Sequence, residues 1–308
     1  MRQTKAIIQR LISGTRILFN PSKQITMTSV NSVRKKAHEM NHQPPKIVHL
    51  SANFLCVDKG YDIKINFDDP TERTLEHQLK EMFPELVDPA VAHSFRYVHR
   101  LDYATSGILC LALNKRASSL LAEEFSKRRV TKYYLALVRG HLEDDMLYID
   151  VPTGDLIDND WPGRRCILTH PCCKHPKQTQ TLIVKLETGY FDKEPVTKIL
   201  LKPITGKQHQ LRVHCDHIGH RVVGDFTYSL REDVKPDRMM LHSYRLTANT
   251  ILEKLDLYTT DPFTSDVLPD WRPVTVCYTY KEAEDLASSF IPYETKKVKH
   301  VTLDCDKG

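Results

Sequence analysis

The residues of this chain best suited to chemistry stand in one polar stretch, His99-Arg-Leu-Asp-Tyr-Ala-Thr-Ser-Gly107. Asp102 is the only carboxylate in this stretch, and Arg100 stands two residues before it. Thr and Ser side chains form local hydrogen bonds in turns, so Thr105 and Ser106 can fix the direction of the acid. The stretch therefore allows two interpretations, a catalytic carboxylate or an exposed ion pair that contributes little to stability.

Apolar segments on both sides must position this acid. A short run ending at Val98 precedes the stretch, and residues 108–113 follow it as Ile-Leu-Cys-Leu-Ala-Leu. Short apolar runs bounded by Gly predict buried strands, so Asp102 is expected on a loop between two core segments. His-Arg-Asp is also the core of a kinase catalytic loop, but the inserted Leu101 and the lack of Asp-Phe-Gly and Gly-rich motifs argue against a kinase.

Two later stretches also combine apolar residues with residues that could do chemistry. Pro203 to His214 reads Pro-Ile-Thr-Gly-Lys-Gln-His-Gln-Leu-Arg-Val-His, and Gly219-His220, Gly224-Asp225 and Tyr228 follow it. Lys132 to Gly140 reads Lys-Tyr-Tyr-Leu-Ala-Leu-Val-Arg-Gly and lies between this stretch and the first one.

In this order and spacing, the three stretches resemble the RluA-type family of RNA pseudouridine synthases. The family's central motif, His-Arg-Leu-Asp-x-x-Thr-Ser-Gly, is matched by residues 99–107 at every specified position. Its later motif is matched by residues 203–214, with Lys207 in place of an Arg. The resemblance covers roughly residues 47–250.

The resemblance implies an α/β (α+β) fold, a single domain around a curved, mostly antiparallel mixed sheet with a catalytic cleft across its middle. It also implies an isomerase that converts uridine in RNA to pseudouridine without a metal, nucleotide or redox cofactor. The sequence agrees on the last point, since it contains neither a Walker nor a Rossmann fingerprint.

The resemblance assigns the catalytic roles to three residues. Asp102 is the expected catalytic carboxylate, and Arg212 is the guanidinium that stabilises its anion in a site that excludes water. Tyr134 is expected to stack on the uracil and to handle the proton at C5. Strand alternation places Tyr133 on the opposite face, as a packing residue.

The other expected site residues bind the substrate. They are His99, Arg100, Thr105, Lys207 and His209. Arg100 would fill the gap left by an everted nucleotide or grip its phosphate. A paired uridine must be flipped out at a cost of a few kcal/mol, which is smallest in unpaired loops.

Apolar periodicity predicts three helices and several short strands around these motifs. The helices are expected at 71–83 with Thr71 as its cap, at 115–129, and at 207–218 with Thr205-Gly206 as its cap. The strands are expected at 47–50 and 54–57 as a hairpin, at 131–138, at 182–186 and 196–201 joined through Gly189 and Pro195, and at 239–246 and 274–280.

Two groups of cations have open interpretations. Lys59 stands in Asp58-Lys59-Gly60, where the family usually has Asn-Lys-Pro, and is either structural or a contact to the RNA backbone. Lys127-Arg-Arg129 ends the second predicted helix, where it either stabilises the helix dipole or contacts phosphates.

Residues 141–180 have the least regular pattern. Five residues of this region suggest zinc, but their spacing fits no standard finger; they are Cys166, His170, Cys172, Cys173 and His175. A surface loop is therefore favoured and no metal site is predicted. The eight Cys residues show no regular spacing, which favours a reducing compartment without disulfides.

The net charge of +5 comes from the N-terminus. Residues 1–46 hold nine Lys and Arg residues and one acid, which leaves a net charge of −3 on the rest of the chain. We therefore expect a basic segment at 1–46, a catalytic domain at 47–280 and a C-terminal extension at 281–308. The basic segment predicts a mitochondrial location, or a cytoplasmic or nuclear one if it is only a tail or an RNA-binding arm.

The partner expected for this body is RNA, whether ribosomal, transfer or messenger. A local patch must bind it, because the body as a whole is not basic. No stretch is apolar enough for a membrane span, and we expect a monomer. The alternative function is an inactive RNA-binding protein that kept the fold, but a binder does not need a buried carboxylate paired with Arg.

Overall fold

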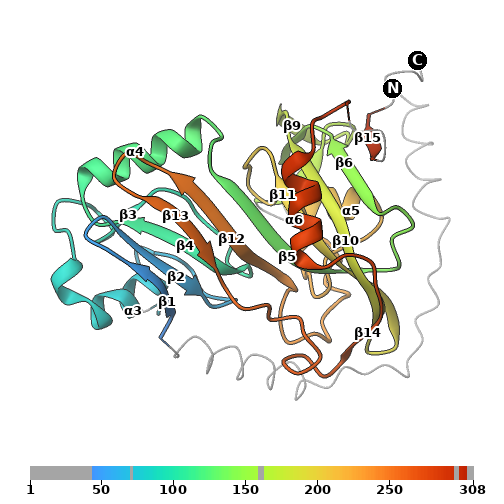
Figure 1. The fold of residues 1–308 in the computed structure, drawn as a ribbon, viewed down its shortest axis with the longest axis horizontal. Coiled ribbons are helices and arrows are strands. Elements are labelled where there is room, and N and C mark those ends of the chain that lie inside the picture. The colour runs from blue at the N-terminus through green and yellow to red at the C-terminus, as the bar shows by residue number, and fades with distance from the viewer. Residues whose placement is uncertain (1–43, 70–71, 159–162, 295–297, 304–308) are drawn as a thin grey trace, which may run out of the picture. The chain divides into compact units, whose positions relative to one another are not determined.

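The computed structural model describes residues 44–308 except 70–71, 159–162, 295–297 and 304–308. Most of its strands form one 12-stranded sheet with the order β1-β2-β4-β12-β5-β11-β10-β6-β15, to which β3, β13 and β14 are added (Figure 1). These strands are β1 (Lys46–Leu50), β2 (Phe54–Lys59), β3 (Arg96–Tyr97), β4 (Ser106–Ala112), β5 (Thr131–Arg139), β6 (Met146–Asp150), β10 (Gln180–Phe191), β11 (Glu194–Pro203), β12 (Leu241–Asn249), β13 (Lys254–Tyr258), β14 (Trp271–Val276) and β15 (Lys299–Thr302). The predictions for residues 1–43, including targeting, lie outside the described residues.

The sheet is mixed and mainly antiparallel. Only the pairs β4–β12 and β6–β15 are parallel among the described strands. The predicted hairpin is confirmed, since β1 and β2 pair antiparallel. The α+β fold class with a mostly antiparallel sheet is likewise confirmed.

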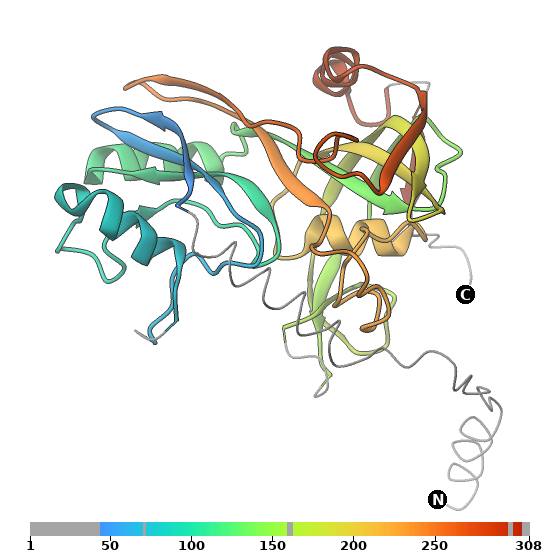
Figure 2. The ribbon, with the colours of Figure 1, turned by 90° about the horizontal axis from the view of Figure 1, so that it is seen from below.

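Four helices and one short turn accompany the sheet in the described part of the chain. They are α3 (Leu75–Met82), the 3₁₀ turn η1 (Pro84–Leu86), α4 (Lys115–Ser126), α5 (Gln210–His217) and α6 (Tyr280–Ser289). Figure 2 shows α5 and α6 on opposite sides of the β10–β11 hairpin. Apolar side chains from the two faces therefore form separate cores.

Strand β5 contributes side chains to both of these cores, because successive side chains point to opposite faces of the sheet. Tyr134 and Ala136 pack in the cluster that includes Leu211 of α5, whereas Tyr133 packs in the cluster that includes Ala283 of α6. The Tyr133 hydroxyl lies 2.9 Å from the Ser288 hydroxyl. The prediction that the two tyrosines face opposite ways is confirmed, because side chains alternate along a strand.

Two of the predicted helix boundaries were wrong because of local capping. Thr74, and not Thr71, caps α3, since its hydroxyl accepts from the His77 amide at 3.3 Å while the His77 ring accepts from the Thr74 amide. The second helix begins where expected, with the Asn114 side chain accepting from the Ala117 amide, but it ends at Ser126. Residues 127–129 therefore follow α4 and do not form its last turn.

Residues 141–180 are more ordered than a surface loop. Strand β6 joins the main sheet, and a second, three-stranded sheet has the order β8-β7-β9. Its strands are β7 (Thr153–Leu156), β8 (Arg165–Ile167) and β9 (Cys173–Lys177). Of the stretch with the Cys and His residues, 168–172 form an exposed turn, as predicted. The strands on either side of this turn were not predicted, because such short strands carry little periodicity.

The connection between the two longest strands also differs from the prediction. Gly189 and Pro195 lie within β10 and β11, where Gly189 pairs with Val196 and Tyr190 with Pro195. The turn is instead made by Asp192 and Lys193, both with positive φ. Strands β12 and β14 complete the sheet, as predicted.

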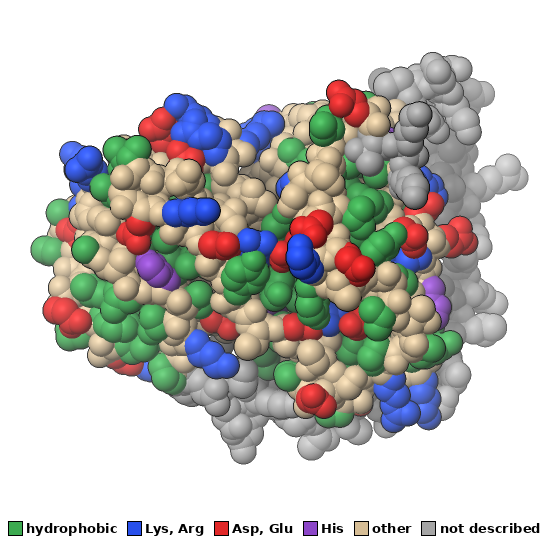
Figure 3. Space-filling view, viewed as in Figure 1, with side chains coloured by type: hydrophobic (Ala, Val, Ile, Leu, Met, Phe, Trp, Pro, Cys, Tyr) green, Lys and Arg blue, Asp and Glu red, His purple; other side chains and the backbone are tan. Residues whose placement is uncertain are grey.

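The C-terminal part packs on this sheet. Thr279 and Glu282 form a capping box at the start of α6, and β15 pairs with β6. The boundary drawn at 280/281 thus falls inside α6. Among the described residues, no helix combines the length and apolar character that a membrane crossing requires. On the face in Figure 3, basic and acidic side chains are interspersed, as a body with no overall basic character would show.

Candidate active site

The loop that carries Asp102 connects β3 to β4 and is fixed at three points. The Thr105 amide donates to the Asp102 carbonyl at 3.1 Å, which closes a turn around the acid. The Lys59 ammonium donates to the carbonyl of Tyr103 at 3.1 Å. Gly107 then enters β4 with φ of 107° and lies so close to β12 that a Cβ there would be 2.2 Å from the Ser243 carbonyl oxygen. Only glycine fits this position.

Lys59 also donates to the carbonyls of Gly60 and Ile63. Its side chain is fully buried, and burial lowers the pKa of the ammonium to about 7. Of the two interpretations of Lys59, the geometry favours the structural one, because the nitrogen is occupied by three backbone carbonyls.

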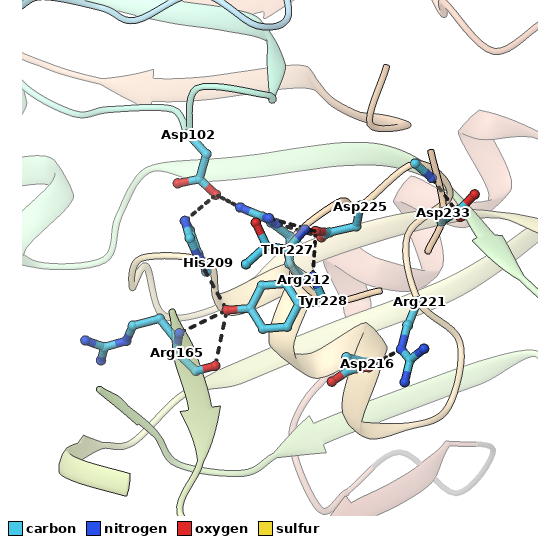
Figure 4. Close-up of polar contacts among 11 residues, drawn as sticks. Asp102, Arg165, His209, Arg212, Asp216, Arg221, Asp225, Thr227, Tyr228 and Asp233 are labelled. Carbon is cyan, nitrogen blue, oxygen red and sulfur yellow. Dashed lines mark hydrogen bonds and ion pairs between the residues drawn. The ribbon is translucent and has the colours of Figure 1, made fainter. Parts of the chain in front are cut away.

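Asp102 faces the N-terminal end of α5 (Figure 4). Its Oδ2 lies 3.5 Å from Nη1 of Arg212 and 3.8 Å from Nε2 of His209. The side chain of Asp102 is 18% exposed, whereas that of Arg212 is 6% exposed. Among the described residues only Oδ2 of this carboxylate is engaged, so Oδ1 is left for a ligand.

Arg212 is held by a second carboxylate, Asp225. The guanidinium donates from Nε and from Nη2 to the two oxygens of Asp225, each at 2.7 Å (Figure 4). Asp225 is 1% exposed and also accepts from the backbone amides of Thr227 and Tyr228 at 3.1 Å. Burial alone would lower the pKa of Arg212, but the hydrogen bonds and charge of Asp225 outweigh it and raise the pKa. Arg212 is therefore a permanent cation in a fixed orientation.

Tyr134 lines the same pocket as Asp102 and Arg212. Burial raises the pKa of its hydroxyl to about 12, with a further increase from the charge of Asp102 and a partial offset from a hydrogen bond with Ser243. The hydroxyl is thus protonated at neutral pH in the free protein.

All of the predicted catalytic and substrate-binding residues line one pocket. They are His99, Arg100, Asp102, Thr105, Tyr134, Lys207, His209 and Arg212. They come from three separate parts of the chain, which the sheet brings together. Their individual roles stay predictions, because proximity alone does not assign them.

The two histidines of this set have different surroundings. His99 accepts from the Cys110 amide at 2.8 Å and stacks on Phe125, and burial lowers its pKa to about 3. The pKa of His209 is lowered to about 4, also by burial. Both rings are therefore neutral at physiological pH. The other ring nitrogen of His209 lies 3.3 Å from the hydroxyl of Tyr228.

The predicted start and cap of α5 were wrong. The helix begins at Gln210, after His209 in a left-handed conformation with φ of 55°. The Thr205 hydroxyl does not cap it, because that hydroxyl donates to the Gln210 side chain at 2.8 Å. Gln210 also accepts from the Lys207 amide. The Thr205 hydroxyl and the Lys207 amide therefore bind the Gln210 side chain, and neither forms the first turn of a longer helix.

Asp225 is the main residue of the site that sequence reasoning did not assign a role. It was visible in Gly224-Asp225, but nothing in that pair indicates a partner in α5. Tyr228 connects the site to the small sheet, since its hydroxyl accepts from the Arg165 amide at 3.1 Å. No group of three or more His, Cys, Asp or Glu side chains in the described part of the chain is arranged to hold a metal ion.

Comparison with known proteins identifies the family of this chain. A sequence model of the RNA pseudouridylate synthase family matches residues 53–217. The chain belongs to this family. It is 45% identical over 237 residues to RNA pseudouridylate synthase domain-containing protein 1 of Homo sapiens, covering 75% of each chain. It is 34% identical over 229 residues to the dual-specificity RNA pseudouridine synthase RluA of Vibrio parahaemolyticus, covering 73% of this chain and 80% of RluA.

Solved structures agree with this membership. The structure of human RNA pseudouridylate synthase domain containing 1 superposes with a TM-score of 0.71 at 38% identity, covering 80% of this chain and 95% of the other. The human domain containing 4 protein shares the fold, with a TM-score of 0.58 at 21% identity, covering 80% of this chain and 99% of the other. The pseudouridine synthase is thus an isomerase that acts on uridine in RNA, and the inactive alternative is not favoured.

Proposed function

We propose that this synthase isomerises uridines in RNA with Asp102 as the catalytic carboxylate, Arg212 as its electrostatic partner and Tyr134 as the residue that contacts the base. The observation that carries this proposal is that the two carboxylate oxygens of Asp102 have different surroundings. One carboxylate oxygen is within 3.5 Å of Arg212, and the other has no partner among the described residues. A reacting atom can therefore approach the second oxygen while the first is held.

The reaction requires one bond to break and one to form. The bond between ribose C1′ and uracil N1 breaks, the uracil turns while bound, and C1′ bonds to C5. The proton on C5 leaves to solvent, and N1 gains a proton, so the product is an isomer. Asp102 starts this sequence either by attacking C1′ or by assisting formation of a glycal, and both routes need the ionised acid.

The surroundings of Asp102 support the ionised form. Arg212 stays charged and lies 3.5 Å from the carboxylate, which favours the anion. Tyr134, protonated in the free protein, offers a ring face for the uracil and a polar tip for proton transfer. Arg100, exposed at the pocket, is suited to a phosphate or to the gap left by the everted nucleotide.

The substrate uridine must leave its stack to reach Asp102, because the acid lies within a pocket. We infer that the targets are uridines in loops or other unpaired regions, where eversion costs least. Ribosomal, transfer and messenger RNA all offer such sites.

Residues 1–46 support a further proposal, that the enzyme acts in mitochondria. They are basic and nearly free of acids. A reporter fused to residues 1–40 should be imported, and a diffuse cytoplasmic or nuclear signal would contradict this.

We also propose that the synthase works as a monomer. Light scattering at several concentrations should give the mass of one chain, 35.6 kDa. A mass near twice that value would contradict the proposal.

The catalytic proposal is tested by tritium release from unmodified transfer and ribosomal RNA that carries [5-³H]uridine. The wild-type protein should release tritium into water, because the proton on C5 is lost. The Asp102→Asn variant keeps the size of the side chain and should release none. Equal release from both proteins, or none from the wild type, would contradict the role of Asp102.

A further inference from the structure

Lys132 is a second cation of the active-site pocket and is partly buried. It stands two residues before Tyr134 on β5, so both side chains project from the same face of the strand, and both line the pocket. Its ammonium makes no hydrogen bond or ion pair with any residue that the structure describes. Burial accordingly lowers the pKa of Lys132, with no neighbouring charge to oppose it.

The buried lysines of the described chain all have acceptors. Lys59 donates to three carbonyls, and Lys198 donates to Asp261 and to the Phe263 carbonyl. Lys185 donates to the carbonyls of Leu142 and Glu143. The partly buried ammonium of Lys132 differs from these, because it has no acceptor among the described residues.

The pocket itself supplies no anion for Lys132. Among the described residues that line it, only Asp102 is acidic, and its engaged oxygen faces Arg212 and His209. The Lys132 nitrogen instead lies 5.7 Å from the centroid of the Phe125 ring and 3.3 Å from the point where a Cβ on Gly206 would be. It thus stands beside the turn that precedes α5, a helix whose N-terminus has no side-chain cap.

We propose that Lys132 binds a phosphodiester of the RNA strand next to the target uridine. The inference rests on the proposed function of the pocket and names one contact within it. An ammonium that is partly removed from water and has no partner in the protein gains from an anionic ligand. The anions that RNA offers are its phosphodiesters. A uracil carbonyl is neutral and would leave the charge uncompensated.

The position also fits the path of a strand. Arg128 and Lys207 line the same pocket and are exposed to solvent. Lys207 belongs to the turn beside Lys132, and Arg128 follows α4. The neighbouring phosphates can therefore meet the exposed cations at the mouth while one phosphate reaches Lys132 inside.

The contact is tested with fluorescein-labelled decauridylate, a single strand whose binding does not require catalysis. Its dissociation constant is measured by fluorescence anisotropy across a series of KCl concentrations. Lys132→Met should weaken binding about tenfold, as loss of one charge-assisted hydrogen bond predicts. It should also reduce the slope of log Kd against log [KCl] by about 0.7, the value for one phosphate contact on a single strand.

Two further variants serve as controls. Lys132→Arg keeps the charge and should keep the wild-type slope. Lys281→Met removes an exposed lysine from α6, on the Tyr133 face of the sheet, and should change neither quantity. An unchanged slope in Lys132→Met, with or without weaker binding, would overturn the phosphate assignment.

Thermal unfolding of the free protein separates this role from a structural one. Because Lys132 makes no hydrogen bond or ion pair with the described residues and its stem is partly buried, Lys132→Met should unfold at the same or a higher temperature than wild type. A large drop in that temperature would show a structural role and overturn the proposal. If wild type binds decauridylate as expected but releases no tritium from any RNA, the proposed function fails while the Lys132 contact stands.

Discussion

Two cations of the pocket, the buried Arg212 and the partly buried Lys132, have opposite surroundings. Arg212 is gripped by Asp225 through two hydrogen bonds of 2.7 Å and offers its remaining nitrogen to Asp102. Lys132 has no such partner among the described residues. The Asp102 side of the pocket is therefore complete before substrate arrives, whereas the Lys132 side is left open.

This difference separates two physical tasks. A catalytic group must hold its geometry while charge develops, which favours a fixed partner that needs no reorganisation. A binding group gains most when its partner is the ligand itself. Changes to Asp102, Arg212 or Asp225 should thus affect turnover and stability strongly. Changes to Lys132 should affect affinity alone.

The largest effect is expected for Asp225→Asn. It leaves Arg212 buried without its main partner, which should cost about 3–5 kcal/mol in the free energy of unfolding. It should also slow tritium release by about a hundredfold, because Arg212 loses its orientation. Urea denaturation and release by the folded protein measure the two effects.

Asp233→Asn is the matched control for that variant. Asp233 also accepts two hydrogen bonds from an arginine, Arg139, and one from the amide of Gly224. This carboxylate does not line the pocket. Its loss should reduce stability but leave release by the folded protein near wild type. Equal losses of activity in both variants would break the comparison.

Gly107→Ala tests the rigidity of the loop that holds Asp102. The added methyl group would meet the Ser243 carbonyl at a position with φ of 107°, and about 3 kcal/mol of unfolding free energy should be lost. Gly219→Ala has φ of 79° but nothing within 4 Å of the new Cβ, so it should cost only about 1 kcal/mol. Similar losses in denaturant titrations would mean that the close approach of β12 does not matter.

Tyr134→Phe tests whether the Tyr134 hydroxyl takes part in the reaction. The ring and its stacking remain, so affinity for RNA should be unchanged, but tritium release should slow by about a hundredfold if the hydroxyl transfers a proton. Tyr133→Phe removes a hydroxyl that contacts Ser288 on the other face and should leave release unaffected. Release by Tyr134→Phe at the wild-type rate would limit this residue to stacking.

The smallest expected effect is a dependence of stability on pH. Burial lowers the pKa of His209 and of His214 from 6.5 to about 4. In the unfolded chain these rings take up protons below pH 6.5, while the folded rings stay neutral, so stability is lost as the pH falls from 6.5 towards 4. Each ring should cost about 2 kcal/mol at roughly pH 5.

His214→Gln isolates one of these contributions, because its ring is fully buried between Thr179 and Thr181. Unfolding free energies measured from neutral pH downwards should fall less steeply in this variant. An identical pH dependence in both proteins would show that His214 is protonated in the folded state.

Short-range pattern was enough for much of this molecule. The two-residue period of β5 separated Tyr133 from Tyr134, and the apolar runs around Asp102 placed it on a loop between strands. These features follow from local geometry, which the sequence carries directly. The pairing of Arg212 with Asp102 was expected only from the family resemblance, and the structure places the two side chains 3.5 Å apart.

Features that depend on distant contacts were decided by the tertiary structure. The side chain of Gln210, the first residue of α5, donates to the Gln180 carbonyl and the Thr181 hydroxyl of β10. Pairing between strands likewise turned much of residues 141–180 into two sheets. Asp225 and Lys132 show this limit of the sequence. Asp225 has a charged partner and Lys132 has none among the described residues, and the sequence predicted neither. A sequence states that a charged side chain is present, but whether it has a partner depends on which segments the fold brings within reach, and burial then makes that difference large.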